Sequence, residues 1–177
     1  MRLVIEQDHD AESPREWDNL GKMVCFHRRY DLGDKQDTLR YQDFNTWEAV
    51  QAYLEKTNPG CLILPVYLYD HSGLTVSTTS FNDRWDSGQI GFIYLTRADI
   101  LANWPNKGRL TPTIKKQAYA ALQAEVETYD QYLRGEVYCY TIEDSEGLVV
   151  DACCGFYGEK ACREAGEEAL SILTTGG

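Results

Sequence analysis

The sequence lacks the short motifs that mark most enzymes and cofactor-binding proteins. It has neither the GxGxxG pattern of dinucleotide-binding folds nor the GxxxxGK pattern of a P-loop, so no phosphate-binding glycine loop is predicted. It also lacks the paired CxxC spacing of zinc knuckles. Asp8-His9-Asp10 groups three potential ligands, but consecutive residues of an extended segment cannot all point at one ion. We interpret that segment as a solvated acidic loop, and we expect no cofactor and no bound metal.

Long hydrophobic runs are missing as well. No apolar stretch approaches the ~20 residues that a membrane-spanning helix needs, and Met1–Ile5 runs straight into acidic residues. We therefore expect no signal peptide, no membrane partner and a cytoplasmic protein with reduced thiols. Cys25, Cys61 and Cys139 favour this interpretation, because each lies in an apolar strand-like run, where free cysteine behaves as a small hydrophobic residue.

Basic residues are scarce relative to acidic ones. The chain has 17 Lys and Arg against 28 Asp and Glu, which gives a formal net charge of −11. Because nucleic-acid binding needs Lys and Arg to neutralise phosphates, direct binding to nucleic acid is not expected. An acidic chain is attracted instead to basic surfaces, such as the channels of DNA-handling proteins, although the same charge also keeps a small protein in solution.

What the sequence does contain is enough apolar material for a folded core. Of its 177 residues, 43% are hydrophobic and 12% aromatic, which predicts one domain over residues 1–177 rather than a disordered chain. Three apolar runs of strand length lie in the middle of the chain, at Leu62–Tyr69, Leu74–Phe81 and Gln89–Thr96. In the first run both the odd-numbered and the even-numbered residues are apolar, so both faces of the strand should be covered, as in a central strand.

Capping residues and periodicity predict the helices. Asn45 and Glu48 have the spacing of a capping box for a helix that runs to Lys56. Thr111 and Pro112 open a long helix that should end at Gly135. The other predicted elements are strands over 3–5 and 22–27, a helix over 97–104, a hairpin of 136–143 with 147–153, a tight turn at 155–158 and a helix over 159–173. Strands and helices are segregated, which predicts an α+β fold whose mainly antiparallel sheet is packed by one long helix and two or three shorter ones.

Thiol chemistry is one candidate activity. Cys153 and Cys154 precede a predicted helix, whose amide dipoles would favour a thiolate. A nucleophile also needs a base, and the three histidines, His9, His27 and His71, have no spacing that pairs them with these cysteines. The alternative interpretation is a strand end packed by two small residues. A small cysteine- or carboxylate-dependent enzyme that acts on a nucleotide or a host protein therefore stays open as an alternative function.

Carboxylates are numerous enough to form a binding surface. Side chains spaced ~6–7 Å apart can imitate the phosphates of a nucleic-acid strand, and exposed aromatic residues suit interface hot spots. These features predict an acidic and aromatic binding surface made of Asp31, Asp34, Asp37, Asp83, Trp85, Asp86, Glu125, Glu127, Asp130, Tyr132, Glu136, Glu143, Asp144 and Glu146. The alternative is that exposed helices and loops simply carry acidic residues.

Four segments resemble small acidic proteins encoded by phages and other mobile elements. They are DNLGKMVCFHRRYDLGD (18–34), GQIGFIYLT (88–96), YDQYLRGEVYCYTIED (129–144) and VDACCGFYG (150–158). The resemblance implies a phage-type accessory protein, a class rich in inhibitors of host defence such as anti-restriction and anti-CRISPR proteins. Many of these inhibitors are compact, acidic and non-enzymatic. The resemblance carries over no catalytic residue, because no motif of a characterised enzyme family is present.

These observations lead to one main hypothesis. The chain is expected to inhibit a host DNA-targeting defence nuclease, a CRISPR effector or a restriction enzyme, in the host cytoplasm. It would bind as a protein, without enzymatic activity, and block nucleic-acid access through carboxylates gathered on one side of its core. A deep pocket lined by a thiol and an imidazole would instead favour the enzyme. A third hypothesis is a phage protein that regulates or assembles with its own copies, for example as a homodimer.

Overall fold

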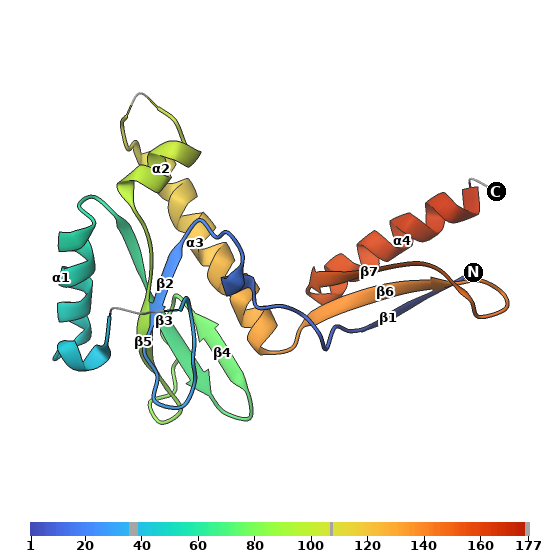
Figure 1. Cartoon of the computed structure of the whole chain (residues 1–177), viewed down its shortest axis with the longest axis horizontal. Helices are drawn as coiled ribbons and strands as arrows, with labels where there is room; N and C mark the ends of the chain where they lie inside the picture. The colour runs from blue at the N-terminus through green and yellow to red at the C-terminus, as the bar shows by residue number, and fades with distance from the viewer. Residues whose placement is uncertain (36–38, 107, 176–177) are drawn as a thin grey trace. The chain divides into compact units, whose positions relative to one another are not determined.

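The chain folds into two compact units, each with its own antiparallel sheet (Figure 1). The computed structural model describes residues 1–35, 39–106 and 108–175. Unit 1 combines Met1–Ser13 with Gln131–Gly177, and unit 2 is Pro14–Asp130. Helices and antiparallel sheets in these units confirm the predicted α+β class, whereas the single domain over residues 1–177 stays a prediction. In the described residues, no helix has the length and apolar character that crossing a membrane requires.

Unit 2 is built on a four-stranded sheet with the order β2-β5-β3-β4. Its strands are β2 (Lys22–Cys25), β3 (Leu62–Asp70), β4 (Leu74–Ser77) and β5 (Ser87–Leu95). The three apolar runs in the middle of the sequence thus form three of the four strands, and β3 lies inside the sheet as predicted. The predicted strand over Leu74–Phe81 is too long, because β4 pairs with β3 only as far as Ser77.

Helices pack on both faces of this sheet (Figure 1). Phe92 and Tyr94 of β5 join a buried cluster with Val50 and Leu54 of α1 (Trp47–Thr57). Residues alternate between the two faces of a strand, so the fully buried Ile93 lies on the other face. A Cβ at Gly21 would lie 3.1 Å from Ile93 and 2.6 Å from Leu122 of the long helix α3 (Pro112–Leu133), so this face of the sheet is near α3. The remaining helical segments of unit 2 are α2 (Arg97–Asn103) and two 3₁₀ turns, Pro14–Glu16 and Tyr41–Asp43.

The helix starts test the capping predictions. Thr46 caps α1, because its Oγ1 accepts a hydrogen bond from Ala49 N at 3.2 Å, so the predicted capping box of Asn45 and Glu48 is wrong by one residue. The start of α3 agrees with its prediction: Thr111 Oγ1 accepts from Ile114 N at 3.3 Å.

Unit 1 is a three-stranded sheet, ordered β1-β6-β7, with one helix on one face. Its elements are β1 (Arg2–Gln7), β6 (Val137–Glu143), β7 (Val149–Tyr157) and α4 (Glu159–Thr175). Tyr140 and Ile142 of β6 pack with the buried Cys162 of α4. Gly166 allows the close approach of helix and sheet, since a Cβ there would lie 2.6 Å from a methyl carbon of Leu3.

Strand β7 continues beyond its predicted end at Cys153. Tyr140 pairs with Cys153 and Tyr138 with Phe156, so two residues of β7 oppose Cys139 alone. This arrangement is a β-bulge, with Gly155 at φ +82°. The predicted tight turn at 155–158 is therefore wrong, because most of that segment belongs to the strand.

The bulge places Cys154 opposite Cys139, and the two form a disulfide. The prediction of six reduced thiols is wrong for this pair, while Cys25, Cys61, Cys153 and Cys162 are free.

Candidate acidic binding surface

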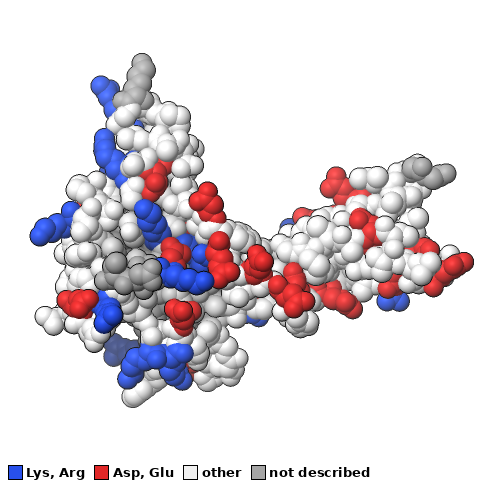
Figure 2. Space-filling model, in the orientation of Figure 1, with Lys and Arg blue, Asp and Glu red and all other residues white. Residues whose placement is uncertain are grey.

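The acidic charge of the chain is concentrated in unit 1. Its two segments, Met1–Ser13 and Gln131–Gly177, carry four Lys and Arg against 13 Asp and Glu, a formal net charge of −9. Unit 2 carries 13 against 15, a net charge of −2, and the two units together give the −11 of the chain. In the view of Figure 2, red groups outnumber blue ones over unit 1, whereas both colours are interspersed over unit 2. Unit 1 therefore carries most of the negative field.

The tip of the β6–β7 hairpin is a predicted acidic site that the structure builds as a turn. Asp144 Oδ1 accepts hydrogen bonds from the backbone N–H groups of Glu146 (2.8 Å) and Leu148 (3.0 Å). These backbone donors, Leu148 first, hold the pKa of Asp144 below its usual value. Glu143 lies 3.7 Å from Arg2, measured from Oε2 to Nε. The turn keeps the Asp144 carboxylate charged and fixed at neutral pH.

Exposed apolar side chains follow directly after this tip. Leu148, Val149 and Val150 are 63%, 61% and 45% exposed at the start of β7. Within the described part of its sheet, β7 has a partner strand on one side, β6, so its other edge is unpaired. Apolar side chains beside carboxylates on a strand edge are suited to protein recognition.

Further carboxylates of unit 1 were missed by the sequence analysis. On α4 they are exposed, and Glu164, Glu167 and Glu168 lie on the side of the helix away from the buried Cys162, so a helical-periodicity analysis of residues 159–173 could have found these three. Of the others, Glu6 lies on β1 and Asp151 on β7, whereas Asp8, Asp10 and Glu12 follow β1 in the segment that the sequence predicts to be a solvated loop. The missed residues are Glu6, Asp8, Asp10, Glu12, Asp151, Glu159, Glu164, Glu167 and Glu168.

Asp34 and Glu125, which the sequence predicts to lie on the binding surface, pair instead with the buried Arg15 of unit 2. Arg15, with a side chain only 3% exposed, donates to Asp34 Oδ1 (2.8 Å) and Glu125 Oε2 (2.9 Å). Asp34 Oδ2 also accepts from Met23 N at 2.7 Å. Glu125 Oε1 accepts from the N–H groups of Leu20 and Gly21. These carboxylates bind loop and strand to α3, so their charge is neutralised locally.

The loop before β5 holds another predicted group. Asp83 Oδ1 accepts from Trp85 N and Asp86 N, which lowers the pKa of Asp83. Asp86 lies 2.9 Å from His71 Nδ1. Trp85 is 95% exposed, the most exposed large hydrophobic side chain among the described residues. The loop thus presents one aromatic ring, while its carboxylates are occupied by the turn and by a histidine.

The other predicted residues are divided between the units. In unit 2, Asp31 is exposed, Glu127 lines a cavity of about 400 Å³ and Asp130 accepts from Val76 N at 2.8 Å. Asp37 lies outside the described residues. In unit 1, Tyr132 is half-buried, and Glu136 pairs with Arg134 at the exit of α3. The predicted residues are thus divided between the two units and do not form one patch. Those acidic residues that belong to unit 1 are among its 13 Asp and Glu residues.

Unit 2 also contains a cavity of about 850 Å³ that Cys25 and His27 both line. Burial, followed by the charge of Asp34, raises the pKa of Cys25 to about 12, so its thiol stays protonated near neutral pH. Burial and then Arg29 lower the pKa of His27. No hydrogen bond joins the thiol to the imidazole among the described residues. This thiol is therefore not prepared as a nucleophile.

Comparison with known proteins adds no assignment. No family model, no curated protein and no solved structure matches the chain.

Proposed function

We propose that the chain is an inhibitor, encoded by a phage or mobile element, of a host DNA-targeting defence nuclease. Unit 1 binds the basic nucleic-acid channel of a CRISPR effector or restriction enzyme in the host cytoplasm and excludes DNA. The observation that carries this proposal is the net charge of −9 on unit 1, against −2 on the longer unit 2. The phage origin rests on the four segments that resemble small acidic phage proteins.

The mechanism combines electrostatic attraction with a small apolar contact. A concentrated negative field accelerates encounter with a basic channel and orients the acidic unit toward it. After contact, Leu148 and Val149 at the hairpin tip bury apolar area, which supplies affinity that salt does not screen. The bound carboxylates then occupy the places of phosphates, so DNA and the inhibitor compete for the same Lys and Arg side chains.

The test compares two charge-neutralised variants on a panel of purified CRISPR effectors and restriction enzymes. The first variant replaces four exposed acids of unit 1, by E146Q, E164Q, E167Q and E168Q. The matched control replaces four exposed acids of unit 2, by E16Q, D18N, D43N and E55Q. Both remove the same formal charge, so only its location differs.

Inhibition of DNA cleavage and the dissociation constant are measured from low to high salt. We expect wild type to inhibit at least one nuclease, with binding that weakens as salt rises. The unit 1 variant should bind about tenfold more weakly, a loss of ~1.4 kcal/mol, and with a smaller salt dependence than the control. Equal effects of the two variants, salt-independent binding, or no inhibition across the panel would each contradict the proposal.

A further inference from the structure

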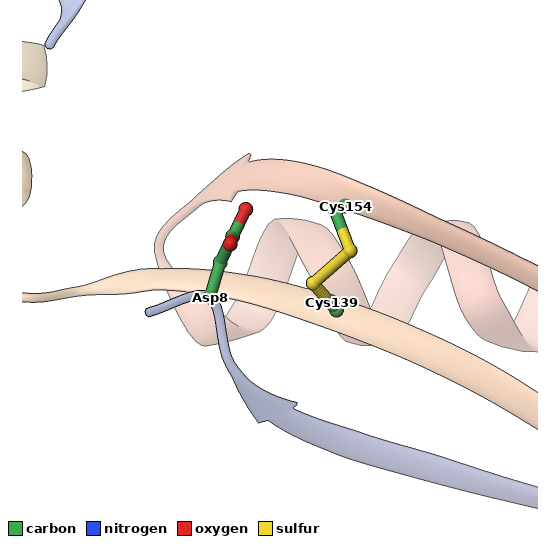
Figure 3. A group of neighbouring side chains, drawn as sticks. All are labelled: Asp8, Cys139 and Cys154. Atoms are coloured by element: carbon green, nitrogen blue, oxygen red, sulfur yellow. A yellow bond between two sulfur atoms is a disulfide. The ribbon is translucent and has the colours of Figure 1, made fainter. Parts of the chain in front are cut away.

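Asp8, Cys139 and Cys154 bring three ligand atoms for a metal ion to one place in unit 1. One atom from each residue lies within 4.8 Å of the other two. Figure 3 shows the Asp8 carboxylate beside the two sulfur atoms. We infer that the reduced thiols of Cys139 and Cys154, together with Asp8, form a Zn²⁺ site, and that the disulfide is its oxidised, metal-free form. This inference does not depend on the proposed function.

The fold assembles this cluster from three strands. Asp8 directly follows β1, and its backbone N–H donates to the carbonyl oxygen of Val137 at 2.8 Å, which holds it against β6. Asp10 N donates to Asp8 Oδ1 at 3.2 Å, which orients the carboxylate. The bulge in β7 brings Cys154 opposite Cys139, with their Cα atoms 3.9 Å apart. The ligands are therefore held by backbone pairing rather than by the disulfide alone.

The distances suit a tetrahedral ion after small side-chain movements. With Zn–S near 2.3 Å and Zn–O near 2.0 Å, tetrahedral ligation places the two sulfurs ~3.8 Å apart and the carboxylate oxygen ~3.5 Å from each. Since the carboxylate oxygen lies within 4.8 Å of both sulfurs, it needs to approach by at most about 1.3 Å. The sulfurs, bonded in the disulfide, separate by rotation about the Cα–Cβ bonds of the two cysteines.

The ligand types select the metal. Two thiolates favour Zn²⁺ over Mg²⁺ or Ca²⁺, which prefer oxygen ligands, and a single carboxylate completes three protein ligands. The fourth position is left to a water molecule, as in zinc sites with three protein ligands. A site with three such ligands binds the ion only when both sulfurs are thiolates.

The change between the two forms balances as a two-electron reduction. A dithiol reductant donates two electrons and two protons, the bond between Cys139 and Cys154 breaks to give two thiols, and the reductant becomes a disulfide. Each thiol then releases its proton to solvent as it binds Zn²⁺. Cytosolic compartments supply such reductants, and Cys154 is exposed to them.

The experiment measures metal content after equilibrium dialysis of the whole chain against ZnCl₂. The protein is reduced with a phosphine, which itself becomes a phosphine oxide and does not compete as a thiol ligand. We expect about one Zn²⁺ per reduced chain and none per oxidised chain. Co²⁺ should give the near-ultraviolet thiolate-to-metal charge-transfer band in the reduced form, and Mg²⁺ should not displace Zn²⁺.

Variants separate the site from general metal binding. The double variant C139S/C154S should lose stoichiometric Zn²⁺ and the cobalt band, and D8N should bind about tenfold more weakly, the scale of losses around metal sites. The matched controls C153S and D10N change a neighbouring thiol and a neighbouring acid and should bind as wild type. Circular dichroism confirms that each variant folds. The inference is overturned if reduced, folded wild type binds no Zn²⁺, or if C139S/C154S binds it equally well.

Discussion

Replacing Arg15 with methionine should destabilise unit 2 strongly, because this guanidinium neutralises two carboxylates where water has little access. Its side chain is 3% exposed and donates to Asp34, Glu125 and the carbonyl oxygen of Gly21. Met keeps much of the apolar volume but leaves two negative charges and a carbonyl without this donor. Removing one partner of a buried ion pair typically costs ~3–5 kcal/mol.

The expected cost lies at the lower end of that range. The carboxylates of Asp34 and Glu125 are 26% and 18% exposed, so water partly solvates them after the change. Their bonds to backbone N–H groups also remain. We therefore expect a loss of about 3 kcal/mol, which lowers the urea midpoint by ~1.5 M if the denaturant slope is ~2 kcal/mol per molar.

Tryptophan fluorescence is the appropriate assay. All four tryptophans, Trp17, Trp47, Trp85 and Trp104, belong to unit 2. Their signal during urea unfolding therefore reports this unit alone, while far-ultraviolet circular dichroism reports both units.

A matched control and a second-site variant make the result decisive. Arg29→Met removes an ion pair with Asp70 from an arginine that is 68% exposed, and should cost less than ~1 kcal/mol. Adding Glu125→Gln to Arg15→Met should recover part of the loss, because one uncompensated charge disappears while the amide oxygen still accepts from the backbone. If Arg15→Met unfolds at the same urea concentration as Arg29→Met, the reasoning about the buried guanidinium is refuted.

Three further predictions follow from single contacts. Gly91→Ala should cost about 3 kcal/mol, at the upper end of overpacking losses, because its Cβ would lie 1.9 Å from a carbonyl oxygen of β2, whereas Gly88→Ala, with open space, should be neutral by urea unfolding. The pKa of Asp144 in the folded protein lies below its usual value of 3.8, so the contribution of this carboxylate to stability is complete above pH 3.8 and is lost as pH falls through the lower folded pKa. NMR titration of the carboxyl carbon measures this pKa, and Asp144→Asn should make the free energy of unfolding less dependent on pH in this acid range. Because burial raises the pKa of Cys25 to about 12, its thiol should resist alkylation at pH 8 in the folded protein, while the exposed Cys153 reacts. Rapid alkylation of both thiols would contradict the burial of the Cys25 thiol.

Local signals in the sequence predicted most of the secondary structure. Thr111, Pro112 and Gly135 mark the ends of α3 because capping depends on neighbouring residues alone. Apolar runs located β3 and β5 for the same reason. The cap of α1 was misplaced by one residue, since Asn45 and Thr46 are both good caps and the choice depends on how the preceding loop enters the helix.

Long-range pairing could not be predicted in the same way. The sequence predicts that this strand ends at Cys153, because Gly155 and Gly158 indicate a turn, but in the structure Gly155 forms a bulge within β7. That one-residue irregularity decides which cysteine opposes Cys139. The role of Asp34 and Glu125 was hidden for a related reason, because Arg15 is 19 and 110 residues away from them in sequence.

The division of charge between the units gives a way to separate folding from binding. It is invisible in the sequence, because unit 1 joins Met1–Ser13 to Gln131–Gly177 through the pairing of β1 with β6. The net charge of −9 on this unit opposes its compact state by self-repulsion, and salt relieves that repulsion. Rising salt should therefore stabilise unit 1, measured as the part of the circular dichroism transition that does not coincide with the tryptophan fluorescence transition of unit 2, while it weakens attraction to a basic partner. If binding is lost over the same salt range in which unit 1 becomes harder to unfold, screening of the interface is the cause and unfolding is not.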